Sequence, residues 1–99
     1  MLTGKQRAYL KSLATDMDPT VYIGKDELGD NIINEMDKYL DAHEMVKVKI
    51  QEGSMADPKE TANECATILK AEYVQAIGRK FVLYRPAKKK EDRKIVLPR

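Results

Sequence analysis

The sequence contains one cysteine, one histidine and no long apolar run among its 99 residues. A single cysteine excludes an internal disulfide framework and fits a reducing compartment. No window approaches the roughly 18 apolar residues of a membrane-spanning helix, and no apolar stretch near the N-terminus resembles a signal peptide. We therefore expect one small cytoplasmic domain with no membrane partner.

Residues that usually carry catalysis or bind metals are scarce. His43 is expected near a helix end, where a favourable contact with the helix dipole explains it. Cys65 shares an apolar helical stripe with Ala62 and Leu69, which indicates buried packing. These residues make neither a metal-ligand set nor a nucleophile–base pair, and no glycine-rich loop is followed by Lys-Ser or Lys-Thr. We expect no enzymatic activity, no metal and no cofactor.

Charge is abundant but unevenly distributed. Residues 1–13 carry three cations and no acid, a net +3, and residues 79–99 carry nine cations and two acids, a net +7. Residues 14–78 carry six lysines and fourteen acids, a net −8. If the two ends meet in space, this pattern predicts one side that faces a polyanion and a solvated acidic side. The alternative is that the lysines at 88–90 belong only to a solvated tail.

Three segments have the apolar spacing of helices. The first spans about residues 4–16 and follows a capping-box pattern at Thr3. The second spans about residues 30–42. The third opens at Asp57, an N-cap residue that is followed by proline at the first helical position.

Four segments have the composition or alternation of strands: 20–23, 45–51, 73–77 and 80–84. The glycine between the last two indicates a hairpin. The order helix, strand, helix, strand, helix, strand, strand predicts a single compact α/β domain over residues 1–86. We expect a mixed four-stranded sheet with two helices packed on one face. Residues 87–99 are expected to form a basic C-terminal tail.

Gly24 and Lys25 lie between the first expected strand and the second helix, in a turn expected at 24–29. Free backbone N–H groups and the positive end of the helix dipole suit an anion at such a junction. Gly24 would let a phosphate approach closely, and Lys25 would add charge. A glycine at a strand end can equally be only a turn residue.

Four stretches of the sequence follow one another in the order of a known family pattern: LTGKQR (2–7), VYIGK (21–25), VKVKI (46–50) and VQAIGRKFVLYR (74–85). The ending IVLP (95–98) fits it as well. The chain thereby resembles the stand-alone bacterial YhbY type of the CRM domain, the chloroplast RNA splicing and ribosome maturation module. The resemblance covers nearly the whole chain.

That resemblance implies a fold similar to the C-terminal domain of translation initiation factor three. It also implies RNA binding, with ribosomal RNA and the precursor of the large ribosomal subunit as partners during subunit assembly, and no DNA. The family's loop is Gly-x-x-Gly, similar to the loop by which KH domains clamp nucleotides. Here Glu27 replaces the second glycine, and Gly29 follows two residues later. Asp26 and Glu27 either weaken RNA binding or favour the helix by lying at its positive end.

The other candidate RNA-binding residues are basic: Lys47, Lys49, Arg79, Lys80, Arg85 and Lys88. Such contacts give affinity and register without sequence preference. Lys47 and Lys49 could instead form a solvated strand face or pack their stems beneath the first helix, and Arg79 and Lys80 could be ordinary turn residues. The tyrosines at 22, 73 and 84 could stack on bases, although aromatic residues in strands usually belong to the core.

A second function remains open. The acidic face of the second helix, with Asp37 and Asp41, could dock a basic ribosomal protein or assembly factor.

Overall fold

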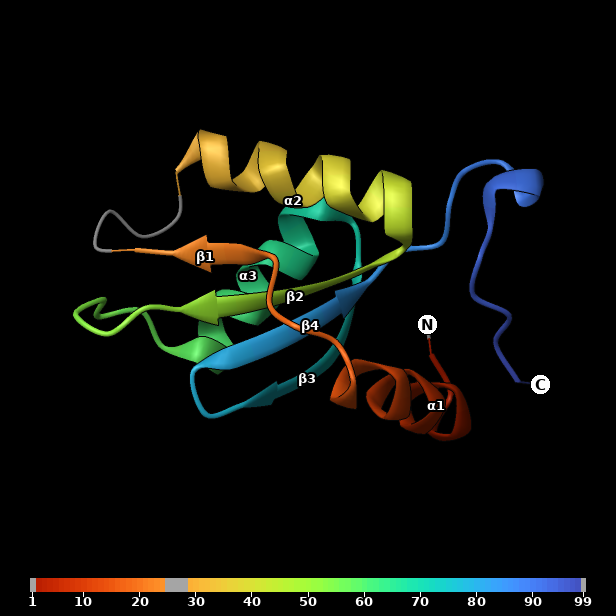
Figure 1. The fold of residues 1–99 in the computed structure, drawn as a ribbon, viewed down its shortest axis with the longest axis horizontal. Helices are drawn as coiled ribbons and strands as arrows, with labels where there is room; N and C mark the ends of the chain where they lie inside the picture. Colours follow the sequence, from red (N-terminus) through yellow and green to blue (C-terminus); the bar gives the residue numbers. More distant parts are fainter. Residues whose placement is uncertain (1, 25–28, 99) are drawn as a thin grey trace.

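A computed structural model describes residues 2–24 and 29–98 (Figure 1). The elements are α1 (Gly4–Thr15), β1 (Val21–Ile23), α2 (Asp30–His43), β2 (Met45–Ile50), α3 (Pro58–Leu69), β3 (Glu72–Ile77), β4 (Lys80–Tyr84) and the short 3-10 helix η1 (Lys90–Asp92). The expected order of helices and strands is confirmed. None of the helices in the described ranges has both the length and the apolar character needed to cross a membrane.

The two predicted helix caps are present. The Thr3 side chain accepts a hydrogen bond from the Gln6 backbone N–H at 3.1 Å, and the Gln6 side chain accepts one from the Thr3 N–H. At the start of α3, Asp57 accepts a hydrogen bond from the Glu60 N–H at 2.9 Å. These bonds satisfy backbone donors that have no partner within the first helical turn.

The four strands form one mixed sheet in the order β1-β2-β4-β3. β1 runs parallel to β2, whereas β2 and β3 each pair antiparallel with β4. The β3–β4 hairpin turns at Gly78, whose φ of +60° lies in the left-handed region that glycine adopts without strain. The predicted mixed four-stranded sheet is thereby confirmed.

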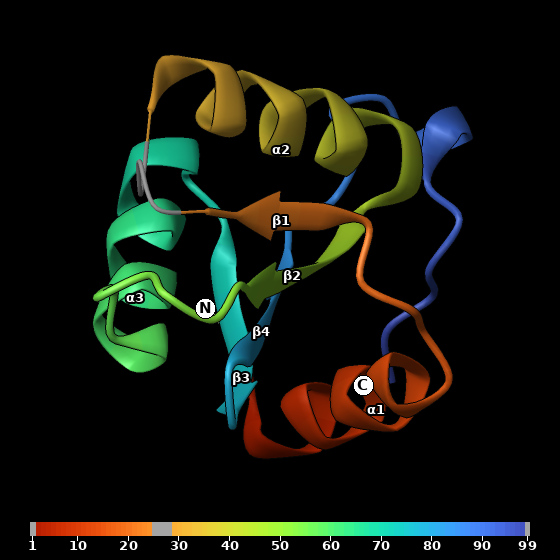
Figure 2. The same ribbon diagram turned by 60° about the vertical axis from the view of Figure 1, so that its left-hand side comes forward.

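The two faces of the sheet are covered differently (Figures 1 and 2). On one face, α2 and α3 bury the main core, which includes Met36, Leu40, Cys65, Val48 and Phe81. On the other face, α1 buries a smaller core against the strands. Its members are Leu2, Leu10, Ala14, Met45, Val74, Val82 and Tyr84.

The segment that follows β4 lies against the domain. Ile95 and Leu97 pack on the smaller core under α1, and the Gln6 side chain donates a hydrogen bond to the Pro98 carbonyl at 3.1 Å. Glu44, fully buried after α2, accepts backbone N–H groups of Ala87, Lys94 and Ile95. A domain boundary at residue 86 stays a prediction, but the residues after it are anchored to α1 and α2.

Candidate nucleic-acid interface

The part of the sheet that α1 leaves uncovered carries a row of side chains across all four strands. The pairing places Tyr22 of β1 beside Lys49 of β2, Lys49 beside Lys80 of β4, and Lys80 beside Ile77 of β3. All four residues are exposed; Tyr22 is 46% and Ile77 67% accessible. We call these four residues the open row. It presents two ammonium groups between an aromatic and an aliphatic side chain.

Lys47 and Lys49, two residues apart on β2, have different surroundings. The Lys47 ammonium donates hydrogen bonds to the carbonyls of Ala14 and Met17, both at 3.0 Å. Lys47 therefore satisfies the end of α1 and the turn after it, with its stem half-buried. Lys49 lies one further step along the same face, where α1 no longer covers the sheet, and it is exposed. Of this pair, Lys49 presents its charge to solvent.

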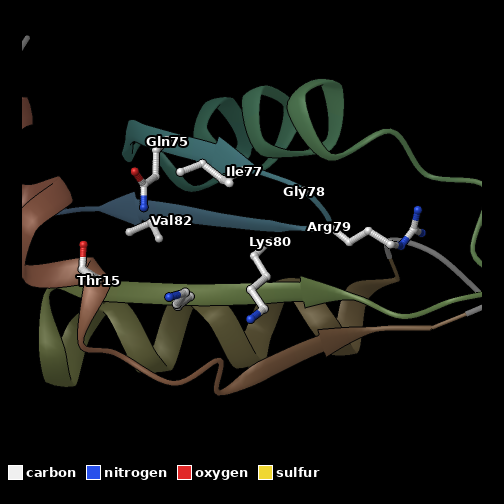
Figure 3. Close-up of a pocket in the computed structure, with 8 residues that line it drawn as sticks. Thr15, Gln75, Ile77, Gly78, Arg79, Lys80 and Val82 are labelled. Atoms are coloured by element: carbon white, nitrogen blue, oxygen red, sulfur yellow. The ribbon is translucent and has the colours of Figure 1, made fainter.

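Two surface hollows flank the open row. The first, of about 470 Å³, lies between the end of α1 and the β3–β4 hairpin (Figure 3). It is lined by Thr15, Lys47, Gln75, Ile77, Gly78, Arg79, Lys80 and Val82. The second, also of about 470 Å³, is lined by Tyr22, Lys49, Ile50, Gln51, Glu52 and Arg79. Both volumes fall in the range of about 300–1,000 Å³ that holds small organic groups.

Arg79 is largely engaged with the protein's own backbone. Its guanidinium donates to the carbonyls of Ile50 at 3.0 Å, Gln51 at 3.2 Å and Ser54 at 3.1 Å. In Figure 3 its side chain extends away from Lys80. Arg79 thus ties the hairpin to the loop after β2, and its assignment as an RNA-binding residue stays a prediction.

Gly24 lies at the same end of the sheet as the open row. It follows β1 directly, and a methyl group added at its Cα would lie 3.3 Å from the Gln51 side-chain oxygen. Its φ is outside the left-handed region, and that oxygen ends a flexible side chain, so neither strain nor packing against the described residues demands glycine here. Lys25, Asp26 and Glu27 lie outside the described residues.

Arg85 and Lys88 lie away from the open row, in a hollow that residues of α2 and the end of α3 also line. In Figure 1 the end of β1 and the helix η1 occupy opposite ends of the long axis, along which the molecule extends 40 Å. Arg85, with a side chain only 15% accessible, pairs with Asp37 at 2.8 Å and with Asp41 at 2.9 Å. Lys88 is exposed. The predicted residues therefore do not form a single patch.

The charge pattern of the sequence predicts one side facing a polyanion if the basic ends of the chain meet, and docking of a basic protein on α2 would need a free acidic face. The basic ends of the chain do meet, because α1 contacts Pro98 through Gln6, but they meet at the end opposite Gly24. On α2, Asp37 and Asp41 hold Arg85, so these two carboxylates already have a cationic partner within the chain. Docking of a basic protein on that helix stays a prediction.

The three strand tyrosines have separate environments. Tyr84 is buried beneath α1, and Tyr73 packs against the main core, as the core interpretation predicted. Tyr22 differs, because it points to the uncovered face. The sequence contained a signal for this placement: Tyr22 stands between the buried Val21 and Ile23, so alternation puts it on the opposite face. The sequence predicts Ile77 only as the end of a strand, and its exposure on this face is found in the structure.

The reactive residue types lie outside this face. Cys65 is fully buried in the main core, where burial and the charge of Glu64 raise the pKa of its thiol to about 12. The packing interpretation of Cys65 is confirmed. His43 ends α2 and lies against Tyr39, with ring centroids 4.3 Å apart. Among the described residues, no three His, Cys, Asp or Glu side chains group as a metal site would require.

Comparison with known proteins points to one family. The model of the CRS1 / YhbY (CRM) domain matches residues 2–85. The chain is 35% identical to the "Probable RNA-binding protein YqeI" of Bacillus subtilis, covering 99% of this chain and 100% of the relative. It is 37% identical to an "RNA-binding protein" of Haemophilus influenzae, covering 99% and 96%. The solution structure of SAV1595 from Staphylococcus aureus superposes with a TM-score of 0.80 at 39% identity, over 99% of this chain and all of that one.

Proposed function

The chain belongs to the CRS1 / YhbY (CRM) domain family, and from this premise we propose that it binds RNA through the uncovered face of its sheet. The observation that carries the proposal is the pairing of Lys49 with Lys80, which places two exposed ammonium groups on adjacent strands beside the strand end that carries Gly24. Relatives of similar length, 35% and 37% identical, bear the name RNA-binding protein.

The chemistry of this face suits the phosphate backbone. Lysine ammonium groups pair with phosphates without reading sequence, and each displaced counterion contributes to affinity. No described residue explains the glycine at position 24 by strain or packing, which agrees with a close approach by a ligand backbone. α2, the next described element along the chain, begins at Asp30, and a helix N-terminus favours negative charge.

Filter binding across a salt series tests this assignment with a double variant, Lys49→Gln with Lys80→Gln. The loss of two phosphate contacts should reduce the steepness of the slope of log affinity against log salt concentration by about 1.4. This figure takes roughly 0.7 for each contact with a single strand. The matched control is Lys38→Gln with Lys59→Gln, two exposed lysines on α2 and α3. Arg79 stays unchanged in both proteins because it holds the loop after β2. Equal slopes in the two variants would contradict the proposal.

We further propose ribosomal RNA as the target, bound during assembly of the large ribosomal subunit in the cytoplasm. The family resemblance supports this target. In vivo crosslinking followed by sequencing of the attached RNA should recover large-subunit ribosomal RNA from precursor particles. Crosslinks spread over messenger RNAs, with none enriched on ribosomal RNA, would exclude this target.

A further inference from the structure

We propose that the open row is a platform for unpaired nucleotides, so that the RNA bound by this protein is single-stranded where it meets the sheet. This inference rests on the proposed RNA binding and adds the class of RNA that the face accepts. Lysines alone would serve a duplex equally well. The side chains on either side of the lysines distinguish a single strand from a duplex.

Tyr22 and Ile77 place apolar surface at both ends of the lysine pair. Nearly half of Tyr22 and two thirds of Ile77 are accessible to solvent. The Tyr22 hydroxyl lies 3.4 Å from the Pro19 carbonyl, to which it donates. Single-stranded RNA offers free base faces that stack on aromatic rings, whereas paired bases in a duplex are stacked on one another and present ribose and phosphate.

The row crosses the whole width of the sheet, so a strand of nucleotides can be laid along it. Three inter-strand steps of about 4.8 Å separate β1 from β3, and the order of the row is aromatic, cation, cation, aliphatic. The lysines can therefore meet the backbone while bases reach the residues on either side. Alternation of stacking platforms with positive charge is how proteins bind single strands without sequence preference.

The hollow beside Tyr22 offers a base a hydrogen-bond acceptor next to the cationic groups of Lys49 and Arg79. Its lining includes the exposed carboxylate of Glu52 next to Tyr22 and Lys49. A carboxylate repels a phosphate but accepts hydrogen bonds from the exocyclic amino groups of bases. The hollow at the Ile77 end, between α1 and the hairpin, is equally large and contains Lys80 on its wall (Figure 3).

The test compares one RNA strand in two states with the full-length protein. The probe is a fluorescent strand of mixed sequence of about 12 nucleotides, within the site sizes known for single-strand binders, used alone and annealed to its complement. We expect tighter binding of the single strand. Tyr22→Ala should weaken single-strand binding by roughly tenfold, as expected for one lost stacking contact, and leave duplex binding unchanged. Tyr22→Phe keeps the ring and should retain wild-type affinity.

Matched controls come from exposed residues of the same type outside the row. Tyr9→Ala on α1 and Ile68→Ala on α3 remove comparable exposed side chains and should leave affinity unchanged, in contrast to Tyr22→Ala and Ile77→Ala. Ultraviolet crosslinking with brominated uridine in the strand should attach RNA to the peptide that contains Tyr22. Circular dichroism of each variant separates a binding defect from misfolding.

The outcomes distinguish this inference from the function on which it rests. Equal affinity of wild type for both RNA states, or equal behaviour of Tyr22→Ala and Tyr9→Ala while the lysine variants lose affinity, would overturn the platform and leave RNA binding intact. Crosslinks confined to α2 or α3 would also overturn it. Failure of the wild-type protein to bind any RNA would overturn both.

Discussion

The Glu44 carboxylate holds the segment after β4 against the end of α2. It is fully buried, its φ of +67° lies in the left-handed region, and it accepts three backbone N–H groups from the segment after β4. Burial alone would raise the pKa of its carboxyl. The hydrogen bonds from Ala87, Ile95 and Lys94, with the charge of Arg93, outweigh burial, and the pKa lies below its ordinary value of 4.5.

The lowered pKa gives a pH-dependent stability with a definite sign. Because the unfolded chain binds this proton more tightly, the stabilisation is complete above about pH 4.5 and is lost as pH falls through the lower folded value. At neutral pH, Glu44→Gln should lower the free energy of unfolding by about 1–3 kcal/mol, since an amide replaces a charged acceptor of buried donors. Urea denaturation at decreasing pH should show this difference shrinking below pH 4.5. Glu35→Gln, an exposed change on α2, should show neither effect.

Lys47 and Lys49 offer a matched pair that separates stability from binding. Lys47→Met removes two hydrogen bonds at the end of α1 and should lower the free energy of unfolding by about 2 kcal/mol. Lys49→Met removes an exposed charge and should leave stability unchanged while the salt slope of RNA binding falls by about 0.7. Urea denaturation of both variants should show a stability loss only in Lys47→Met. Anisotropy titrations of both should show the smaller salt slope only in Lys49→Met. The same loss of stability in both variants would contradict the assigned roles.

At the scale of elements, the segment after β4 stabilises α1 on the sheet. Ile95 and Leu97 point into the smaller core, whereas Val96 between them is 82% accessible. The double change Ile95→Ala with Leu97→Ala should lower the free energy of unfolding by about 2 kcal/mol, because half-buried aliphatic groups leave the core. Amide hydrogen exchange should then accelerate in α1 more than in α3. Val96→Ala is the control. If amide exchange in α1 accelerated equally in the Val96→Ala variant, the anchoring role of Ile95 and Leu97 would be disproved.

The sequence predicted helices and strands well because their signals are local. The caps at Thr3 and Asp57 and the alternation in residues 45–51 each depend on neighbours within a few positions. Side-chain partners were not predictable in this way. Arg85 looked like a phosphate ligand, and its pairing with Asp37 and Asp41 joins residues 48 and 44 positions apart. Which of Lys47 and Lys49 remains free depends on where α1 docks, and no local pattern contains that information.

At the scale of the whole molecule, cationic groups occupy two separate regions of a body that extends 40 Å. Lys49 and Lys80 lie near the end of β1, while Lys88 lies between β4 and η1, in a hollow that residues of α2 and α3 also line. α2 and α3 cover the opposite face of the sheet, so RNA on the open row would not contact them. A ligand that reaches both cationic regions must therefore be long. A short RNA should contact only one of the two cationic regions.

This separation makes the effect of Lys88 depend on RNA length. At a rise of about 3.4 Å per nucleotide, a stacked strand of about 6 nucleotides spans roughly half of the molecule's 40 Å and one of about 16 exceeds it. Lys88→Gln with Lys89→Gln should weaken binding of the longer strand severalfold and leave the shorter strand unaffected. Lys49→Gln with Lys80→Gln should weaken both strands. Anisotropy titrations at one fixed salt concentration measure all four affinities, and a loss for the short strand in the Lys88 variant would show that the two cationic regions do not act as separate contacts.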